Sequence, residues 1–267
     1  MARLAILGFG GALPVAIAQA NPDAMQITLK GIPSALGAPA RCFELEKIGT
    51  LFAALKSAGV TRLVFAGALT RPPLNPAAFD ADMTRIAPHL MQALTQGDDA
   101  LLRQVITVFE EQGFEVLGAS EVLPEICAQD GLCIGPEPTA RDWADVARGA
   151  EILAAMSPLD IGQGCAVAAG LCLGIETIQG TDAILRYVAQ TDPALKRGQK
   201  GVYVKAAKRG QDLRIDMPAI GPDTLRNVAA AGLGGLVVEA GKVVLLEREA
   251  TLQAARDAGI FLIAKAL

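Results

Sequence analysis

The chain has 267 residues, of which 52% are hydrophobic, and a formal net charge of −4. This length allows one large domain or two modest ones, and the mild acidity excludes the broad basic face of a typical nucleic-acid-binding protein. The chain has one histidine, His89, and five cysteines, none of them in a Cys-x-x-Cys pair. This composition excludes a structural zinc site and a catalytic triad that uses histidine. A bound metal would therefore be a hard cation with oxygen ligands.

The first residues fit a strand, a turn and a short helix better than a signal peptide. Leu4–Leu7 is a short apolar run, and the glycines at 8, 10 and 11 with Pro14 would break the helix of a signal peptide. No apolar run approaches the roughly 20 residues that a transmembrane helix needs. We therefore expect a cytoplasmic protein.

Strands and helices alternate through the first half of the chain. Strands are predicted at Leu4–Leu7, Ala24–Leu29 and Arg62–Phe65, and helices at Glu46–Ala58, Asp80–Thr95 and Asp98–Glu111. The alternation predicts a mostly parallel, doubly wound α/β sheet with its sites at the carboxyl ends of the strands. Prolines and glycines break the pattern between residues 124 and 140, which predicts domains at 1–132 and 133–267.

The second half is predicted to be α/β or α+β, and its pattern does not choose between them. The predicted elements are a helix at Thr139–Met156, a hairpin over Cys165–Thr177, a helix from Gly180, strands at Val202–Ala206 and Leu213–Ile215, a helix at Leu225–Ala231, a hairpin pairing Val237–Val238 with Val243–Leu246, a helix at Glu247–Ala258 and a strand at Ile260–Ala264.

Glycines and one arginine in the first half are candidates for phosphate binding. Gly10 and Gly11, at the first strand–helix turn, would let a phosphate approach backbone N–H groups, although a tight turn alone is the alternative. Leu13 stands where a dinucleotide fingerprint needs glycine, which disfavours an NAD-linked enzyme. Arg71 follows the third strand and is either a bidentate phosphate ligand or a surface arginine.

Carboxylates accumulate in the second half at the ends of apolar segments. Asp160, Glu176 and Asp182 could converge at one edge of a sheet, beside Gln163 and Thr181. Helix capping is the alternative for Thr181 and Asp182. If the three acids do meet, they offer the oxygen ligands that Mg²⁺ prefers.

A basic stretch ends in a further acid. The alternation in Arg214-Ile215-Asp216 predicts a strand that projects a cation and an acid on one face. Together with Lys205 and Lys208, Arg214 supplies the positive charge that a pyrophosphate needs. By local pattern alone, Asp216 would be a salt-bridge partner.

In their order along the chain, these motifs resemble one family, the UDP-2,3-diacylglucosamine pyrophosphatases of lipid A biosynthesis that are unrelated to metallophosphoesterases. The motifs are Gly10-Gly11-Ala12-Leu13-Pro14, Phe65-Ala66-Gly67, Arg71-Pro72, Gly97-Asp98-Asp99-Ala100-Leu101-Leu102-Arg103, Leu159-Asp160-Ile161-Gly162-Gln163-Gly164, Gly180-Thr181-Asp182-Ala183, Arg214-Ile215-Asp216-Met217-Pro218-Ala219-Ile220-Gly221 and Glu239-Ala240-Gly241. Ala68 and Lys208-Arg209 depart from the usual family pattern.

The resemblance implies a Rossmann-like N-terminal domain, a separate C-terminal catalytic domain and Mg²⁺-dependent hydrolysis of UDP-2,3-diacylglucosamine to UMP and 2,3-diacylglucosamine 1-phosphate. It also implies that Asp216 is essential, as a base or as a metal ligand. The candidate catalytic residues are Asp216, Asp182, Lys205 and Arg214, the candidate substrate-binding residues are Gly10, Gly11, Arg71, Gln163 and Thr181, and the candidate metal ligands are Asp216, Asp182, Asp160 and Glu176.

Two further expectations concern partners. Transient contact with the inner-membrane surface is expected because acyl chains prefer lipid, and a homodimer is allowed. A carrier that binds the same lipid-linked nucleotide without cleaving it is the alternative function, and such a carrier would not need the acids.

Overall fold

A computed structural model describes residues 3–69 and 73–267, which form two compact units. The first unit contains the described residues up to Pro124 together with Asp212–Asp216, and the second contains Glu125–Gln211 and Met217–Leu267. The chain therefore passes from one unit to the other three times. Among the described residues, no helix is long and apolar enough to cross a membrane.

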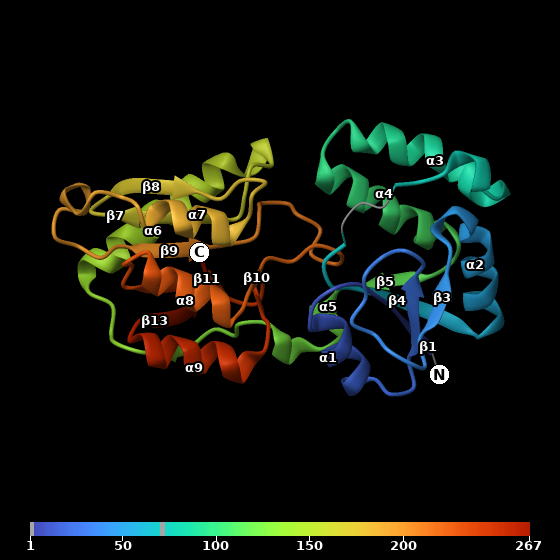
Figure 1. The fold of residues 1–267 in the computed structure, drawn as a ribbon, viewed down its shortest axis with the longest axis horizontal. Coiled ribbons are helices and arrows are strands. Elements are labelled where there is room, and N and C mark those ends of the chain that lie inside the picture. The colour runs from blue at the N-terminus through green and yellow to red at the C-terminus, as the bar shows by residue number, and fades with distance from the viewer. Residues whose placement is uncertain (1–2, 70–72) are drawn as a thin grey trace. The chain divides into compact units, whose positions relative to one another are not determined.

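The first unit is built on one parallel sheet (Figure 1). Its strands lie in the order β3-β2-β1-β4-β5. The order reverses between β1 and β4, which is the point where open α/β sheets form a crevice for ligands. The bounds are β1 (Arg3–Gly8), β2 (Met25–Leu29), β3 (Arg41–Phe43), β4 (Val60–Ala66) and β5 (Glu115–Leu117). The predicted parallel N-terminal domain is confirmed.

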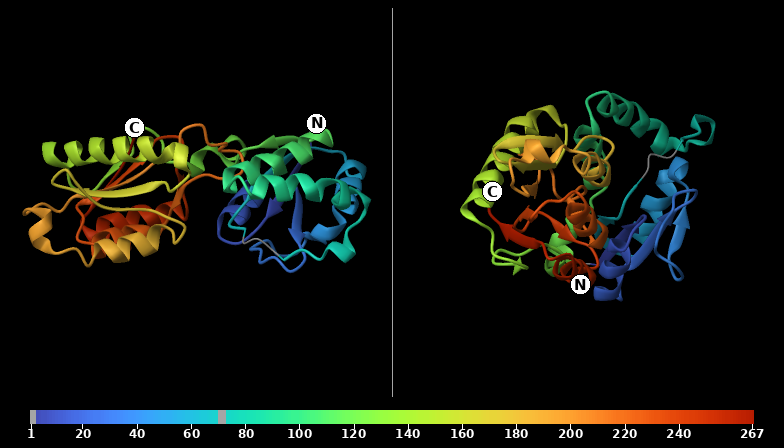
Figure 2. Two further views of the ribbon diagram at one scale, coloured as in Figure 1. Left: turned by 90° about the horizontal axis from the view of Figure 1, so that it is seen from above. Right: turned by 60° about the vertical axis from the view of Figure 1, so that its left-hand side comes forward.

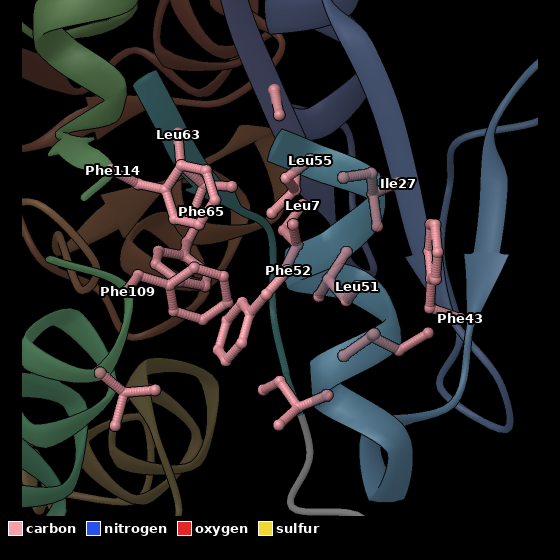
Figure 3. Close-up of a cluster of buried hydrophobic side chains, with 14 of the residues drawn as sticks. Leu7, Ile27, Phe43, Leu51, Phe52, Leu55, Leu63, Phe65, Phe109 and Phe114 are labelled. Atoms are coloured by element: carbon pink, nitrogen blue, oxygen red, sulfur yellow. The ribbon is translucent and has the colours of Figure 1, made fainter. Parts of the chain in front are cut away.

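Helices α2, α3 and α4 bury one face of this sheet under a core rich in phenylalanine (Figure 3). The ring of Phe109 meets the rings of Phe52 and Phe65 edge-on, at centroid distances of 5.3 and 5.2 Å. Edge-to-face pairs of this kind stabilise a core beyond the area they bury. The helical segments are α1 (Leu13–Ala20), η1 (Leu45–Lys47), α2 (Ile48–Ser57), η2 (Pro76–Ala78), α3 (Ala81–Leu94), α4 (Asp98–Glu111) and α5 (Ala119–Val122).

The second unit has a mixed sheet in the order β6-β13-β11-β9-β7-β8. Strands β9, β11 and β13 are parallel, whereas β7 is antiparallel to both β9 and β8. As a result β8 runs in the same direction as β9, and both end at the same edge of the sheet. The bounds are β6 (Cys133–Ile134), β7 (Gly164–Ala168), β8 (Leu171–Ile175), β9 (Val202–Lys205), β11 (Gly235–Glu239) and β13 (Phe261–Lys265).

Alternating side chains of this sheet enter two separate cores. Helix α6 covers one face of this sheet, and α8 and α9 cover the other (Figure 2). In β9, Val202 and Val204 pack on the side of α6, while Tyr203 packs on the side of α7, α8 and α9. Lys205 follows Tyr203 by two residues and so lies on the same face. The helical segments are η3 (Pro124–Ile126), α6 (Ala140–Met156), η4 (Ser157–Leu159), α7 (Thr181–Val188), η5 (Pro193–Lys196), α8 (Pro222–Ala230) and α9 (Arg248–Ala258).

Two predicted elements are wrong. Residues Leu213–Ile215 form a turn rather than a strand, because Arg214 pairs with Glu110 and Ile215 packs against the core of the first unit. Residues 237–246 do not form a hairpin: β11 pairs with β9 and β13, whereas β12 (Val244–Leu245) pairs with β10 (Ala219–Ile220) in a separate parallel pair. The turn at Ala240-Gly241 exists but does not join paired strands.

Candidate active site

A buried ionic cluster lies where β8 and β9 end in the second unit. The Lys205 ammonium donates to Glu176 Oε2 at 3.1 Å and to Thr181 Oγ1 at 2.6 Å, and Thr181 Oγ1 in turn donates to Glu176 Oε2 at 3.0 Å. Tyr203 Oη donates to the same Glu176 oxygen at 2.9 Å. The side chains of Lys205 and Glu176 are only 5% and 13% exposed, so their attraction is weakly screened by solvent.

The tyrosine of this cluster is a fixed hydrogen-bond donor. Tyr203 is fully buried, and that burial, with the charge of Glu176, raises the pKa of Tyr203 well above its usual range. Its hydroxyl therefore stays protonated at neutral pH. Since Glu176 Oε2 receives bonds from an ammonium, a threonine and a tyrosine, the carboxylate and the ammonium are held in one arrangement.

Two glycines make room for this cluster. A Cβ at Gly164 would lie 1.8 Å from Tyr203 Oη and 2.6 Å from Glu176 Oε2, and a Cβ at Gly162 would lie 1.9 Å from the Glu176 carbonyl oxygen. The backbone of Glu176 also donates to the Gly164 carbonyl at 2.8 Å. The glycines of the segment Asp160–Gly164 are thus required because Glu176 and Tyr203 approach the backbone there.

The other predicted polar residues of the second unit have separate partners. Asp160 pairs with Lys208 Nζ, while Gln163 Nε2 donates to Gln211 Oε1 at 3.3 Å. These contacts join the loop before β7 to the loop after β9. Asp182 is exposed, and its Oδ1 accepts from Asn227 Nδ2 at 2.8 Å, which links α7 to α8.

In the first unit, the loops after β1 and β4 are hydrogen-bonded to each other. Ala68 N donates to the Gly10 carbonyl at 2.9 Å, and Gly10 N donates to the Ala68 carbonyl at 3.2 Å. Gly67 adopts a φ of +98°, and a Cβ there would lie 2.4 Å from the Gly10 carbonyl oxygen. Gly10 and Gly11 thus lie at the topological switch point, as their proposed role requires. Arg71 lies outside the described residues.

Segment Asp212–Asp216 is anchored to the first unit. Arg214 Nη2 pairs with Asp212 Oδ2 at 2.7 Å and Arg214 Nη1 pairs with Glu110 Oε1 of α4 at 2.7 Å, while Ile215 packs against the core. Hydrogen bonds from Arg214 lower the pKa of Asp212. Asp216 is half-buried and is the last residue before the chain returns to the second unit.

The four predicted metal ligands are not gathered into one cluster. Asp160, Glu176 and Asp182 each have different partners within the second unit, and Asp216 belongs to the first. Over the described ranges of the chain, no group of three or more histidine, cysteine or acidic side chains is arranged to hold a metal ion. Single carboxylates of this kind suit Mg²⁺ chemically.

Tyr203 is the member of the cluster that the sequence did not reveal. It lies within the apolar run Val202–Val204, where a tyrosine looks like an ordinary core residue. The available signal was indirect: Lys205 lies two residues later on the same strand, so a cation and a phenol had to share a face. Lys205, Glu176 and Thr181 were all predicted as site residues, and the structure brings these three together.

A parallel-sheet unit followed by a mixed-sheet unit with a buried acid–base cluster defines a two-domain α/β protein, and sequence comparison gives its family. The model of the LpxI N-terminal domain matches residues 3–126, and that of the LpxI C-terminal domain matches residues 129–263. The chain belongs to the LpxI family.

A particular relative covers nearly the whole chain. It is UDP-2,3-diacylglucosamine pyrophosphatase LpxI of Caulobacter vibrioides, which is 37% identical over 272 residues, covering 98% of this chain and 97% of the relative. The resemblance drawn from the ordered motifs is confirmed.

Proposed function

We propose that this protein hydrolyses the pyrophosphate bond of UDP-2,3-diacylglucosamine to give UMP and 2,3-diacylglucosamine 1-phosphate in lipid A biosynthesis. The observation that carries this proposal is the full-length similarity to a curated pyrophosphatase of that specificity, across both domains. The buried cluster around Lys205 supports it, because a fixed ammonium can stabilise the charge of a phosphate.

Lys205 is the proposed electrostatic group of the second unit. An ammonium has three N–H donors, and Glu176 and Thr181 accept two of them. The third would contact a phosphate oxygen, and Tyr203 and Thr181 keep the Glu176 carboxylate beside the ammonium. Because these groups are already in place, binding a phosphate requires little reorganisation.

Asp216 is the proposed essential acid. Its position follows Arg214 and Ile215, which hold the segment to the first unit through ion pairs and core packing. The Asp216 carboxylate would position or deprotonate water, or ligate a cation. Mg²⁺ is proposed as the cofactor: it is commonly held by one or two carboxylates plus substrate phosphates, and it would neutralise charge on the pyrophosphate.

The direct test is release of UMP from UDP-2,3-diacylglucosamine by the purified protein, with and without EDTA. We expect turnover that EDTA abolishes and added Mg²⁺ restores. No UMP release under any condition would contradict the proposed hydrolysis, whereas release that survives EDTA would contradict only the Mg²⁺ requirement.

Asp216→Ala separates an enzyme from a carrier. An enzyme loses turnover but still binds the lipid-nucleotide, whereas a carrier has no turnover to lose and keeps its binding.

Hydrolysis in ¹⁸O-water locates the attack of water. We expect the label in 2,3-diacylglucosamine 1-phosphate, since water is proposed to attack the phosphorus attached to the sugar. Label in UMP would contradict that step.

We also propose that the protein works in the cytoplasm and touches the inner-membrane surface transiently. Apolar side chains support this: Ile178, two residues after Glu176, is 94% exposed, and Leu159, the last residue of η4, is 67% exposed. Exposed apolar groups favour a lipid surface. Co-flotation with vesicles should fall for Ile178→Ser and stay unchanged for the control Thr177→Ser.

A further inference from the structure

Two cysteines on neighbouring strands of the second unit lie in contact. The sulfur of Cys165 on β7 is 3.8 Å from the sulfur of Cys172 on β8, within hydrogen-bonding distance. Both are free thiols, but Cys165 is fully buried and Cys172 is exposed. The contact therefore connects a thiol that solvent reaches to one that solvent does not reach.

The surroundings of the pair make the two thiols unequal. The hydrogen bond with Cys165, together with the backbone of Gly174 and the charge of Arg148, lowers the pKa of Cys172, although partial burial opposes this change. The same hydrogen bond and burial raise the pKa of Cys165. These shifts favour the thiolate, which is the nucleophilic form, at Cys172 and the protonated thiol at Cys165.

The strand that carries Cys172 is the easier one to move. In the described part of the chain β8 lies at the edge of its sheet, whereas β7 lies between β9 and β8. Leu173 is an extra residue in β8, because Ala166 pairs with Gly174 and Val167 pairs with Cys172. A bulged edge strand can adjust more freely than a central one, so the sulfurs can close from contact to the ~2.05 Å of a disulfide.

We propose that Cys172 and Cys165 form a peroxide-reactive thiol pair. The Cys172 thiolate attacks one oxygen of a hydroperoxide, the O–O bond breaks, and Cys172 sulfenic acid forms as hydroxide or alkoxide leaves. The Cys165 sulfur then attacks the Cys172 sulfur, and the sulfenic hydroxyl leaves as water with the Cys165 proton. Two electrons pass from the thiols to one peroxide for each disulfide formed.

The test uses the full chain with its other exposed thiols, Cys42 and Cys133, replaced by serine, so that only the buried Cys127 accompanies the pair. Treatment with hydrogen peroxide should remove two free thiols and lower the intact mass by two hydrogen atoms, and dithiothreitol should restore both. Peptide mapping should find Cys165 joined to Cys172. Retention of all three thiols, or a disulfide that includes Cys127, would overturn the proposal.

Single variants separate the two roles. In Cys165→Ala the reaction should stop at a sulfenic acid that dimedone traps on Cys172, and in Cys172→Ser the rate of thiol loss should fall at least about tenfold. In the untreated protein, alkylation of Cys172 should have a pH midpoint clearly below the ~8.5 of an ordinary thiol. A midpoint near the ~8.5 of an ordinary thiol, or equal rates in Cys172→Ser, would contradict the assignment.

Discussion

The two sheets present different chemistry at the ends of their parallel strands. In the first unit, the loops after β1 and β4 meet through backbone hydrogen bonds between Gly10 and Ala68. In the second unit, the ends of β8 and β9 carry side chains, with Lys205 and Glu176 buried against each other. One edge depends on close approach of backbone, and the other on paired charge.

This difference decides which substitutions each edge tolerates. A backbone-built loop is sensitive to any added Cβ but insensitive to charge, whereas a buried ion pair is sensitive to the loss of one partner. The same contrast appears between the buried Lys205–Glu176 pair and the exposed Lys30–Glu44 pair of the first unit. The predictions below test these contrasts, from the largest expected effect to the smallest.

Lys205→Met should have the largest effect. It removes the proposed phosphate-binding ammonium and leaves the Glu176 carboxylate buried without its counter-charge. We expect UMP release to fall about 100-fold and the free energy of unfolding in urea to fall by about 3 kcal/mol.

Glu176→Gln tests the cause of that instability. Added to Lys205→Met, it should restore part of the lost stability, because no unpaired charge remains, but none of the lost activity. If Lys205→Met alone left the free energy of unfolding unchanged, the Lys205–Glu176 pair would not stabilise this edge of the second sheet.

Gly67→Ala should destabilise the first unit more than Gly11→Ala. Both positions have positive φ, +98° and +89°, but a Cβ at Gly67 would lie 2.4 Å from the Gly10 carbonyl oxygen, while a Cβ at Gly11 has no atom within 4 Å. We expect losses of about 2 kcal/mol for Gly67→Ala and about 1 kcal/mol for Gly11→Ala. Equal losses in thermal or urea unfolding would mean that the contact between the loops does not matter.

Arg214→Gln should weaken the anchor of segment Asp212–Asp216 in a pH-dependent manner. Arg214 lowers the pKa of Asp212, so this stabilisation is present above the unfolded pKa of about 3.9 and is lost as pH falls through the lower folded value. Because Arg214 is 35% exposed, we expect a difference from the wild type of about 1 kcal/mol or less near neutral pH.

The difference between Arg214→Gln and the wild type should shrink below about pH 4, as Asp212 takes up its proton. It should also shrink in high salt, which screens a partly exposed pair. A difference that stays constant from pH 7 to pH 3 would contradict the assignment to Asp212.

Lys30→Met should leave the free energy of unfolding unchanged and alter only the pKa of Glu44. Hydrogen bonds from Lys30 and Lys47 lower the pKa of Glu44 to about 2. Removing Lys30 should move the Glu44 midpoint, followed by NMR, toward the ~4.3 of a free glutamate. A clear loss of stability in urea would show that this exposed pair behaves like the buried one.

Regular elements with strong local signals were predictable. Helix α4 spans Asp98–Glu111, as predicted, because its apolar period and the preceding Gly97 are local features. The hairpin of β7 and β8 was also predicted from the break at Gly170, which has a φ of +76°. The very short strands β3, β5, β6 and β10 were missed, since two or three residues carry too little pattern.

Segment Leu213–Ile215 shows where local pattern misleads. Its alternation of polar and apolar residues is typical of a strand, but Ile215 packs, partly buried, against the core of the first unit and Arg214 is paired with Glu110, about a hundred positions earlier in the chain. No local signal specifies a partner at that separation. Arg214, predicted to supply positive charge to a pyrophosphate, pairs in the structure with Asp212 and Glu110.

The sequence by itself determined most helices and longer strands, the family and three of the four residues of the buried cluster, because periodicity and motif order are properties of the chain alone. Tertiary structure decided that Tyr203 completes the cluster, that Asp160 and Asp182 have other partners, and that residues 212–216 belong to the first unit. These outcomes depend on which strands become neighbours, and strand pairing is set by long-range burial and hydrogen bonding rather than by local propensity.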